Sequence, residues 1–240
     1  YVLNALAAGK HVFVEKPLCL TENELHEIVS VYESKADKPQ FMVGFNRRFS
    51  PFARAVKEFF KSGPLAMNYR INAGKIPASS WIQDSETGGG RIIGEVCHFV
   101  DLLTYLSGSL PASVYAVSVD DCDSLDDILT IAIKYRNQSV GSISYFSNGD
   151  KSLSKEYLEV YGNGNTAILD DFRSLKIHSR GKKTEKKLFS QDKGQKQEIV
   201  EFINAIRSGN SAISFDEIFS TTLLTFKIIE SLRTGLAIRL

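Results

Sequence analysis

Two patterns of apolar positions follow one another along the chain. Up to residue 45, short apolar stretches with helical spacing alternate with short runs of β-branched and aromatic residues. We expect helices at 1–8 and from Thr21 onward, where threonine is a favourable N-cap, and buried strands at 11–14 and 41–45. Helices and strands that alternate with tight links are typical of a parallel α/β sheet.

After residue 45 the spacing changes. A period-two alternation runs from about residue 112 to 177, broken by turn-forming residues such as Asn148-Gly149, and predicts an antiparallel sheet. A further strand at 65–73 and four helices are expected around it, at 51–60, about 91–106, 195–208 and 216–233. The predicted fold class is α/β plus α+β: a remnant of a parallel sheet over residues 1–45, then a larger domain over residues 46–240 with a mainly antiparallel sheet and flanking helices.

The first residues do not look like a natural start. Tyr1 opens directly into a helix, without a cap or an initiator methionine. We therefore interpret the chain as a piece of a longer protein.

Composition and charge exclude several classes of function. The 29 basic and 28 acidic residues give a net charge of +1, so neither nucleic acid nor an anionic membrane is an expected partner. No apolar run is long enough to span a bilayer, and no signal peptide is visible. The three cysteines (Cys19, Cys97 and Cys122) lack CxxC spacing and the four histidines are scattered, so we expect a reduced, cytoplasmic protein without a metal site.

Two motif matches are set aside. The segment Gly162-Asn-Gly-Asn-Thr-Ala167 fits the GxGxxA form of a dinucleotide fingerprint, but the residues after it lack the apolar stripe of a helix. It is interpreted as a turn between strands. The basic stretch from Arg180 to Lys187 is interpreted as a solvated hairpin tip or loop.

Two polar clusters follow the two strands of the first part. Glu15-Lys16-Pro17 comes directly after the first strand, and ligands of open α/β sheets bind beyond the carboxyl ends of strands. Proline after lysine forces a sharp turn, cis or trans, that can aim the lysine sideways. Asn46 and Arg48 follow the second strand and can hold a polyhydroxylated or anionic substrate. Alone, the first cluster is more often a surface charge pair, and the second is as often a domain junction.

A third cluster begins at three consecutive glycines, Gly88-Gly89-Gly90, which allow the backbone to approach a ligand or another loop closely. On the helix that follows, His98 and Asp101 share a face, and Glu95 neighbours His98. A histidine beside carboxylates suits general acid–base work near neutral pH. Alone, a helix histidine is more often a packing residue.

Together and in this order, the three clusters resemble the Gfo/Idh/MocA family of oxidoreductases. The resemblance covers residues 1 to about 110, with looser support in the strand-rich part beyond. It implies that residues 1–45 are the last part of a Rossmann domain. It also implies that residues 46–240 form a substrate-binding domain whose open sheet commonly mediates homo-oligomerisation.

The resemblance further implies roles for individual residues. Lys16 matches the family lysine near the nicotinamide and the reacting hydroxyl, and His98 matches the histidine assigned as acid or base. Glu15, Lys16 and Pro17 would border NAD or NADP. The substrate contacts would come from Asn46, Arg48 and Asp101.

Two features depart from the family pattern. The Gly-rich phosphate loop is absent, and because each βαβ unit takes about 30 residues, roughly a hundred are expected in front of Tyr1. Many members carry an aspartate four residues before the histidine, where this chain has Gly94. Glu95 is the candidate replacement as a catalytic residue, although an offset of one residue is a rotation of about 100°.

The preferred hypothesis is reversible hydride transfer between NAD(P) and a hydroxyl carbon of a sugar, nucleotide-sugar or polyol. A non-catalytic protein that senses a sugar or cofactor is the alternative, motivated by Gly94. A module of a fused multi-domain enzyme is a third. The residues that would choose NAD over NADP lie outside this sequence.

Overall fold

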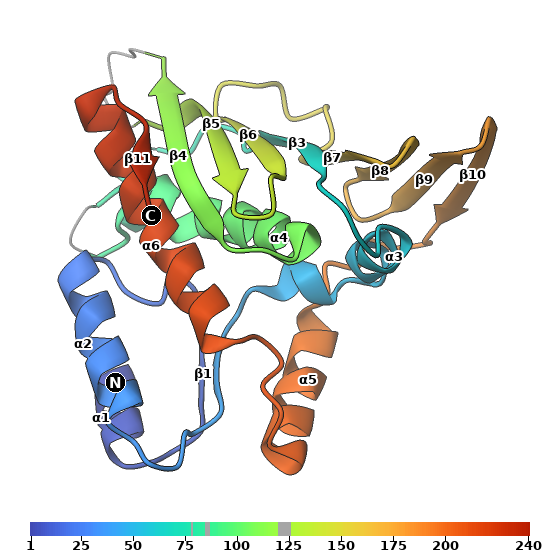
Figure 1. Ribbon diagram of the computed structural model, residues 1–240. Coiled ribbons are helices and arrows are strands. Elements are labelled where there is room, and N and C mark those ends of the chain that lie inside the picture. The colour runs from blue at the N-terminus through green and yellow to red at the C-terminus, as the bar shows by residue number, and fades with distance from the viewer. Residues whose placement is uncertain (78, 85–86, 120–125) are drawn as a thin grey trace.

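A computed structural model describes residues 1–77, 79–84, 87–119 and 126–240 (Figure 1). Cys122 lies outside the described residues. The chain forms a small parallel sheet, a large mixed sheet and helices that pack on both. The predicted fold class is therefore confirmed, and the two sheets appear in the predicted order along the chain.

The small sheet consists of β1 (Val12–Val14) and β2 (Phe41–Val43), which pair in parallel. The helices α1 (Val2–Ala7) and α2 (Glu22–Glu33) precede and connect them. Thr21 caps α2 as expected, and Glu24 completes a capping box by accepting from the Thr21 amide. This part of the chain matches the expected alternation element by element.

The large sheet has nine strands in the order β10-β9-β8-β7-β3-β6-β5-β4-β11. The neighbours are antiparallel except for β3 and β6, which run parallel. The alternating segment thus folds as expected, while the parallel pair, β10 and β11 were not predicted. The strands are β3 (Ala66–Asn72), β4 (Pro111–Ser118), β5 (Ile128–Tyr135), β6 (Val140–Phe146), β7 (Glu156–Gly162), β8 (Asn165–Asp170), β9 (Ser174–Ser179), β10 (Lys182–Lys187) and β11 (Ile238–Arg239).

Of the two segments set aside, the first is a turn as expected, and the second is a hairpin tip at Arg180-Gly181 that continues into a strand, β10. Gly162 to Asn165 connects β7 to β8 in a hairpin, so no helix follows it to receive a phosphate. The basic stretch forms the β9–β10 hairpin, and every residue of β10 is exposed. Lysines on an edge strand discourage pairing with another chain.

Helices cover one face of the large sheet. They are α3 (Pro51–Phe59), α4 (Cys97–Ser107) and α6 (Phe215–Thr234), which contact β8, β6 and β4 respectively. Figure 1 shows α4 and α6 on this face, while α5 (Gln195–Ser208) lies lower, against the small sheet. The apolar residues of the strands, such as Tyr69, Ile71 and Leu158, point to the helices and are buried.

The helix expected at 91–106 contains an irregularity that the sequence did not predict. Its first part, Ile92–Val96, is a π-helical turn, and α4 continues directly from Cys97. A π-helical turn holds one residue more than an α-helical turn, so it rotates the side chains before it relative to those after it. Such turns are frequent at functional sites, and this one contains Gly94 and Glu95.

Two hydrophobic cores hold the molecule together. The larger lies between the large sheet and its helices. The smaller surrounds β1 and β2 and also includes Cys97, Ile213 and Ile218 from later parts of the chain. Tyr32 of α2, for example, stacks on Phe215 of α6 with ring centroids 3.9 Å apart. The small sheet is thus completed by the C-terminal helices.

Candidate active site

Lys16 connects the end of β1 to the π-helical turn. The Lys16–Pro17 peptide bond is cis. The Lys16 ammonium donates a hydrogen bond of 2.7 Å to the main-chain carbonyl of Gly94, 78 residues further along the chain. The first and third clusters of the sequence therefore meet in space.

His98 lies one turn beyond, in α4, and is 8% exposed. Its Nδ1 atom is buried and has no hydrogen-bond partner among the described residues. The pKa of His98 is held well below its ordinary value. Burial is the largest cause, and the positive charges of Arg47 and Lys16 add to it. The imidazole is therefore neutral at pH 7, and one of its ring nitrogens carries a lone pair.

Glu15 lies beside Gly44, at the point where β1 and β2 end. A Cβ atom on residue 44 would come within 3.0 Å of Glu15 Oε2, so glycine leaves room for this carboxylate. Glu15 is exposed, and Lys16 and Pro17 are half-buried. The three residues assigned to the cofactor thus stand at the carboxyl edge of a parallel sheet, where ligands of such sheets bind.

Glu95 points away from Lys16, toward the large sheet. Its carboxylate accepts from Lys155 Nζ at 2.5 Å, from the Tyr145 hydroxyl at 2.5 Å and from Arg91 at 3.2 Å. Burial alone would raise the pKa of Glu95, but these donors, Lys155 foremost, lower it to about 2. A carboxylate held so firmly in its ionised form does not suit proton transfer near pH 7, so the geometry favours a structural role over the catalytic role expected for Glu95.

The three predicted substrate contacts have their polar atoms engaged within the protein. Arg48 forms a two-bond ion pair with Asp101, at 2.6 and 3.0 Å, and both side chains are buried. Asn46 donates to the main-chain carbonyl of Lys193 at 2.9 Å. The geometry therefore favours supporting roles for these residues and gives no support for direct substrate contact by Asp101, which is fully buried.

A buried cluster behind His98 was not predicted. Glu156, at the start of β7, is fully buried and accepts two hydrogen bonds from Arg47, at 2.8 and 2.9 Å. Lys193 donates to the same carboxylate at 2.6 Å, and the Tyr69 hydroxyl donates to it as well. The sequence carried one signal for this cluster: Glu156 lies in phase with the inward-facing Leu158 and Val160, where an apolar residue is expected.

Glu198, in the first turn of α5, is a second unpredicted feature. It is 5% exposed, and its Oε2 atom is buried without a hydrogen-bond partner among the described residues. Phe202, one turn later, packs on Phe13 of β1 at 5.6 Å, so Glu198 faces the side of β1 that carries Glu15. The pKa of Glu198 is raised to about 7, mainly by burial and further by the negative charges of Glu15 and Asp101.

In the glycine turn before the π-helical turn, the backbone of Gly88 lies very close to the backbone of Trp81. A Cβ atom on residue 88 would lie 2.3 Å from the carbonyl oxygen of Trp81. Only glycine fits there, and the close neighbour is the turn Trp81–Gln83 of the same connection between β3 and α4, neither the ligand nor the separate loop that the sequence suggested.

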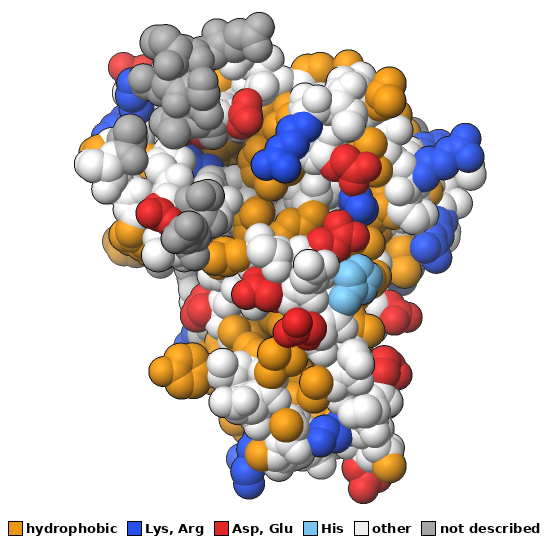
Figure 2. Space-filling model, turned by 90° about the vertical axis from the view of Figure 1, so that its left-hand side faces the viewer, with side chains coloured by type: hydrophobic (Ala, Val, Ile, Leu, Met, Phe, Trp, Pro, Cys, Tyr) orange, Lys and Arg blue, Asp and Glu red, His pale blue; other side chains and the backbone are white. Residues whose placement is uncertain are grey.

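Neither a membrane span nor a metal cluster is found in the described part of the chain. Its helices are too short or too polar to cross a bilayer. No group of three or more histidine, cysteine or acidic side chains among the described residues is arranged to hold a metal ion. Positive and negative side chains are interspersed on the face shown in Figure 2, without a continuous patch of one sign.

Comparison with known proteins identifies the family. Residues 64–238 match the C-terminal alpha/beta domain of the Gfo/Idh/MocA oxidoreductase family, and residues 1–45 match its NAD-binding Rossmann fold. The chain belongs to the Gfo/Idh/MocA oxidoreductase family, which confirms the resemblance drawn from the sequence.

Relatives of known or suggested activity include dehydrogenases of polyols and sugars. The chain is 26% identical to the uncharacterized oxidoreductase YrbE of Bacillus subtilis and 25% identical to the myo-inositol 2-dehydrogenase of Thermotoga maritima, each over 183 residues. These matches cover 73% of this chain and 53% and 54% of the relatives, so the chain spans about half the length of the curated relatives that it matches.

Solved structures share the fold at lower identity. A levoglucosan dehydrogenase in complex with NADH and levoglucosan superposes with a TM-score of 0.84 at 21% identity, over 99% of this chain and 76% of that one. The aldose-aldose oxidoreductase of Caulobacter crescentus, complexed with glycerol, gives 0.83 at 18% identity, over 100% and 75%. At such identities the likeness establishes the fold alone.

Proposed function

We propose that the protein is an NAD(P)-dependent oxidoreductase that transfers hydride between the nicotinamide and a hydroxyl carbon of a sugar, nucleotide-sugar or polyol. The observation that carries the proposal is the pairing of a buried, neutral His98 that has a free ring nitrogen with Lys16 at the carboxyl edge of the parallel sheet. The dehydrogenase relatives support the same reaction class.

In the proposed mechanism, His98 and Lys16 act on the same hydroxyl oxygen of the substrate in different ways. His98 accepts the hydroxyl proton, a role worth typically 10²–10⁴ in rate. Lys16 donates a hydrogen bond to the same oxygen and stabilises the negative charge that develops there. The hydrogen bond to the Gly94 carbonyl fixes the direction of the ammonium in advance, which lowers the entropy lost on reaching the reactive geometry.

The residues at the edge of the small sheet fit the nicotinamide end of the cofactor. Lys16 and Pro17 lie where β1 ends, and the exposed Glu15 carboxylate can accept from a ribose hydroxyl. When bound, the nicotinamide supplies the hydride acceptor or donor. Among the described residues, we assign none to binding the pyrophosphate of the cofactor.

Reduction of NAD and NADP across a panel of sugars and polyols, including myo-inositol and levoglucosan, tests the proposal. His98→Ala should lower kcat by about 10²–10⁴ and leave the Kd for the cofactor within about threefold. His178→Ala is the matched control, because His178 is exposed on β9. Unchanged turnover in His98→Ala would remove this residue from the mechanism.

The alternative function is a protein that binds a sugar or cofactor without turning it over. One observation favours it: Lys16 is held by a main-chain carbonyl rather than by a carboxylate. Cofactor binding without reduction by any member of the panel would select this alternative.

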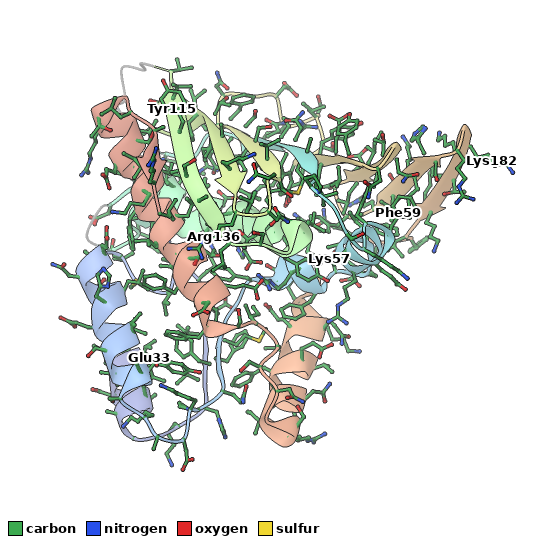
Figure 3. The ribbon with its side chains drawn as sticks, in the orientation of Figure 1. Glu33, Lys57, Phe59, Tyr115, Arg136 and Lys182 are labelled. Atoms are coloured by element: carbon green, nitrogen blue, oxygen red, sulfur yellow. The ribbon has the colours of Figure 1, made fainter. Side chains whose placement is uncertain are left out.

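We also propose a homo-oligomer that forms through the open face of the large sheet. Tyr115, Val117, Val140 and Tyr161 on this face are exposed apolar side chains, and Tyr115, labelled on β4 in Figure 3, alternates with Val114 and Ala116, which are buried on the helix side. Tyr115, Val140 and Tyr161 line a shallow hollow of about 500 Å³. A Tyr115→Lys variant should shift the molecular mass in light scattering from oligomer to monomer.

The proposed cellular location is the cytoplasm, since Cys19 and Cys97 are buried, free thiols.

A further inference from the structure

A polar hollow of about 650 Å³ lies at one end of the large sheet. Its walls come from the end of β3, the loop between β6 and β7, and the turn between β8 and β9. The side chains that give it its chemistry are Lys151, Lys155, Arg173, Asp170, Asp171 and Ser174. The volume lies within the range of small-molecule pockets in proteins, which is about 300–1,000 Å³.

The hollow shares a wall with the candidate active site. Lys155 lines the hollow, and its ammonium donates to Glu95, which lies three residues before His98 on the same continuous helix. The next residue, Glu156, is the carboxylate held by Arg47 behind His98. On the other side, the Asp171 amide donates to the Glu156 carbonyl at 2.7 Å. Lys155 therefore contacts both the hollow and the helix that carries His98.

The walls are fixed before any ligand arrives. The amide of Asn72 donates to the carbonyls of Asp150 and Leu153, at 2.6 and 3.2 Å. Arg70 donates to the Ser154 carbonyl at 2.5 Å. These bonds hold the β6–β7 loop against the end of β3, so the hollow is preformed and its occupation orders few groups.

The chemistry of the walls selects the kind of ligand. Three cationic side chains line the hollow, so it does not suit a metal ion. Two carboxylates stand among them, which is unfavourable for a phosphate or another strong anion. Hydrogen-bond donors and acceptors placed together match sugar hydroxyls, because each hydroxyl both donates and accepts. Arg173 is available for such a bond, since its side chain is 66% exposed and its nearest acid, Asp171, is 3.9 Å away.

We propose that the hollow binds a second sugar unit, so that the substrate is a disaccharide or larger glycoside rather than a free monosaccharide. The proposal rests on the proposed function, which places the reacting hydroxyl at His98. The neighbouring unit then lies against Lys155, Arg173 and Asp171. It adds affinity through hydrogen bonds that a monosaccharide at His98 cannot make.

Calorimetric binding of sugars to the protein without cofactor tests this subsite apart from catalysis. The probes are cellobiose, maltose and lactose, each compared with glucose and galactose. We expect at least one disaccharide to bind tenfold or more tightly than its component monosaccharides. In the double variant Lys151→Ala/Arg173→Ala this gain should fall to less than threefold, whereas Lys182→Ala, at the distant tip of β10 in Figure 3, should retain it.

Two results would overturn the subsite: no disaccharide binds more tightly than its monosaccharides, or the gain persists in the double variant. Both substituted side chains are exposed, so the variant should fold, and its circular dichroism spectrum checks this. Turnover is measured separately. A disaccharide gain without any NAD(P) reduction would defeat the proposed function and leave the subsite intact.

Discussion

The Lys16 ammonium and the Gly94 carbonyl are joined by a hydrogen bond of 2.7 Å, although 78 residues separate them in the sequence. The carbonyl belongs to the π-helical turn Ile92–Val96, and Gly94 has no side chain to offer in its place. The backbone thus supplies the acceptor that orients the lysine, which leaves Lys16 without a carboxylate counter-ion at this contact.

This contact predicts the behaviour of Lys16→Met. Loss of the ammonium should lower kcat by about 10²–10³, because the charge that develops on the substrate oxygen loses a donor. The thermal midpoint should change by less than about 2 °C, since Lys16 makes a single hydrogen bond within the described part of the chain. Lys35→Met is the matched control: Lys35 is also half-buried and donates to a main-chain carbonyl, but that carbonyl belongs to Ala7 of α1 and not to the π-helical turn. Equal kcat in the two variants would refute a role for Lys16 in turnover.

Glu95→Gln separates a structural carboxylate from a catalytic one. Because the pKa of Glu95 is lowered to about 2, its contribution to stability is present above pH 4.5 and is lost as the pH falls toward 2. At pH 7 we expect the variant to lose about 1–3 kcal/mol in the free energy of unfolding, measured with urea, and the difference to shrink at pH 3. Turnover should stay within about tenfold of the parent, with an unshifted pH profile. A loss as large as that expected for His98→Ala would restore Glu95 to the catalytic set.

Breaking the buried Arg48–Asp101 pair should destabilise the protein much more than breaking a partly exposed ion pair. Arg48→Met leaves the Asp101 carboxylate buried without its main partner and should cost about 3–5 kcal/mol in the free energy of unfolding. Arg54→Met should cost about 1 kcal/mol or less, because the Arg54–Glu201 pair is partly exposed. The double variant Arg48→Met/Asp101→Leu should recover part of the loss. Similar losses for Arg48→Met and Arg54→Met would contradict this account of the buried pair.

Glu198→Gln should stabilise the protein at alkaline pH. A carboxyl whose pKa is raised to about 7 in the folded state holds its proton more tightly than the unfolded chain does, so the protein loses stability as the pH rises from 4.5 to 7. The glutamine variant avoids this loss and should gain about 1–3 kcal/mol over the parent at pH 8, with little difference at pH 4. Glu201→Gln, three residues further along α5, is the control, because the pKa of Glu201 is lowered. Urea unfolding at the two pH values gives the comparison, and a constant difference between parent and Glu198→Gln would show that Glu198 does not titrate in this range.

The sequence predicted the elements well, because capping residues and apolar spacing are local signals. The Thr21 cap, the α5 boundaries and the meander of hairpins all follow from residues close to one another in the chain. The strand order did not follow, since the position of β3 depends on residues more than seventy positions later.

The candidate site was predicted in part for a similar reason. The spacing of Glu95, His98 and Asp101 was read from an ideal α-helix, and the π-helical turn turns Glu95 toward Tyr145 and Lys155 instead. The partner of Arg47 lies 109 residues away, so no local pattern links them. Glu198 looks like an ordinary acid in a first helical turn, and only its burial distinguishes it.

The central place of β3 affects how the chain folds as it is made. On one side of β3 the strands β7 to β10 are a run of neighbouring hairpins, and on the other β4 to β6 are such a run, with β11 added at the edge. β3 itself pairs with β6 and β7, whose last residue is Gly162. During synthesis β3 emerges well before either partner, and it can pair with β6 only after about seventy further residues and with β7 only after about ninety. Pairing over such sequence separations closes long loops and is slow. Tyr69, which bonds to Glu156 from β3, therefore joins the cluster behind His98 only when the two halves of the sheet are brought together, and we expect this region of the nascent chain to depend most on chaperones.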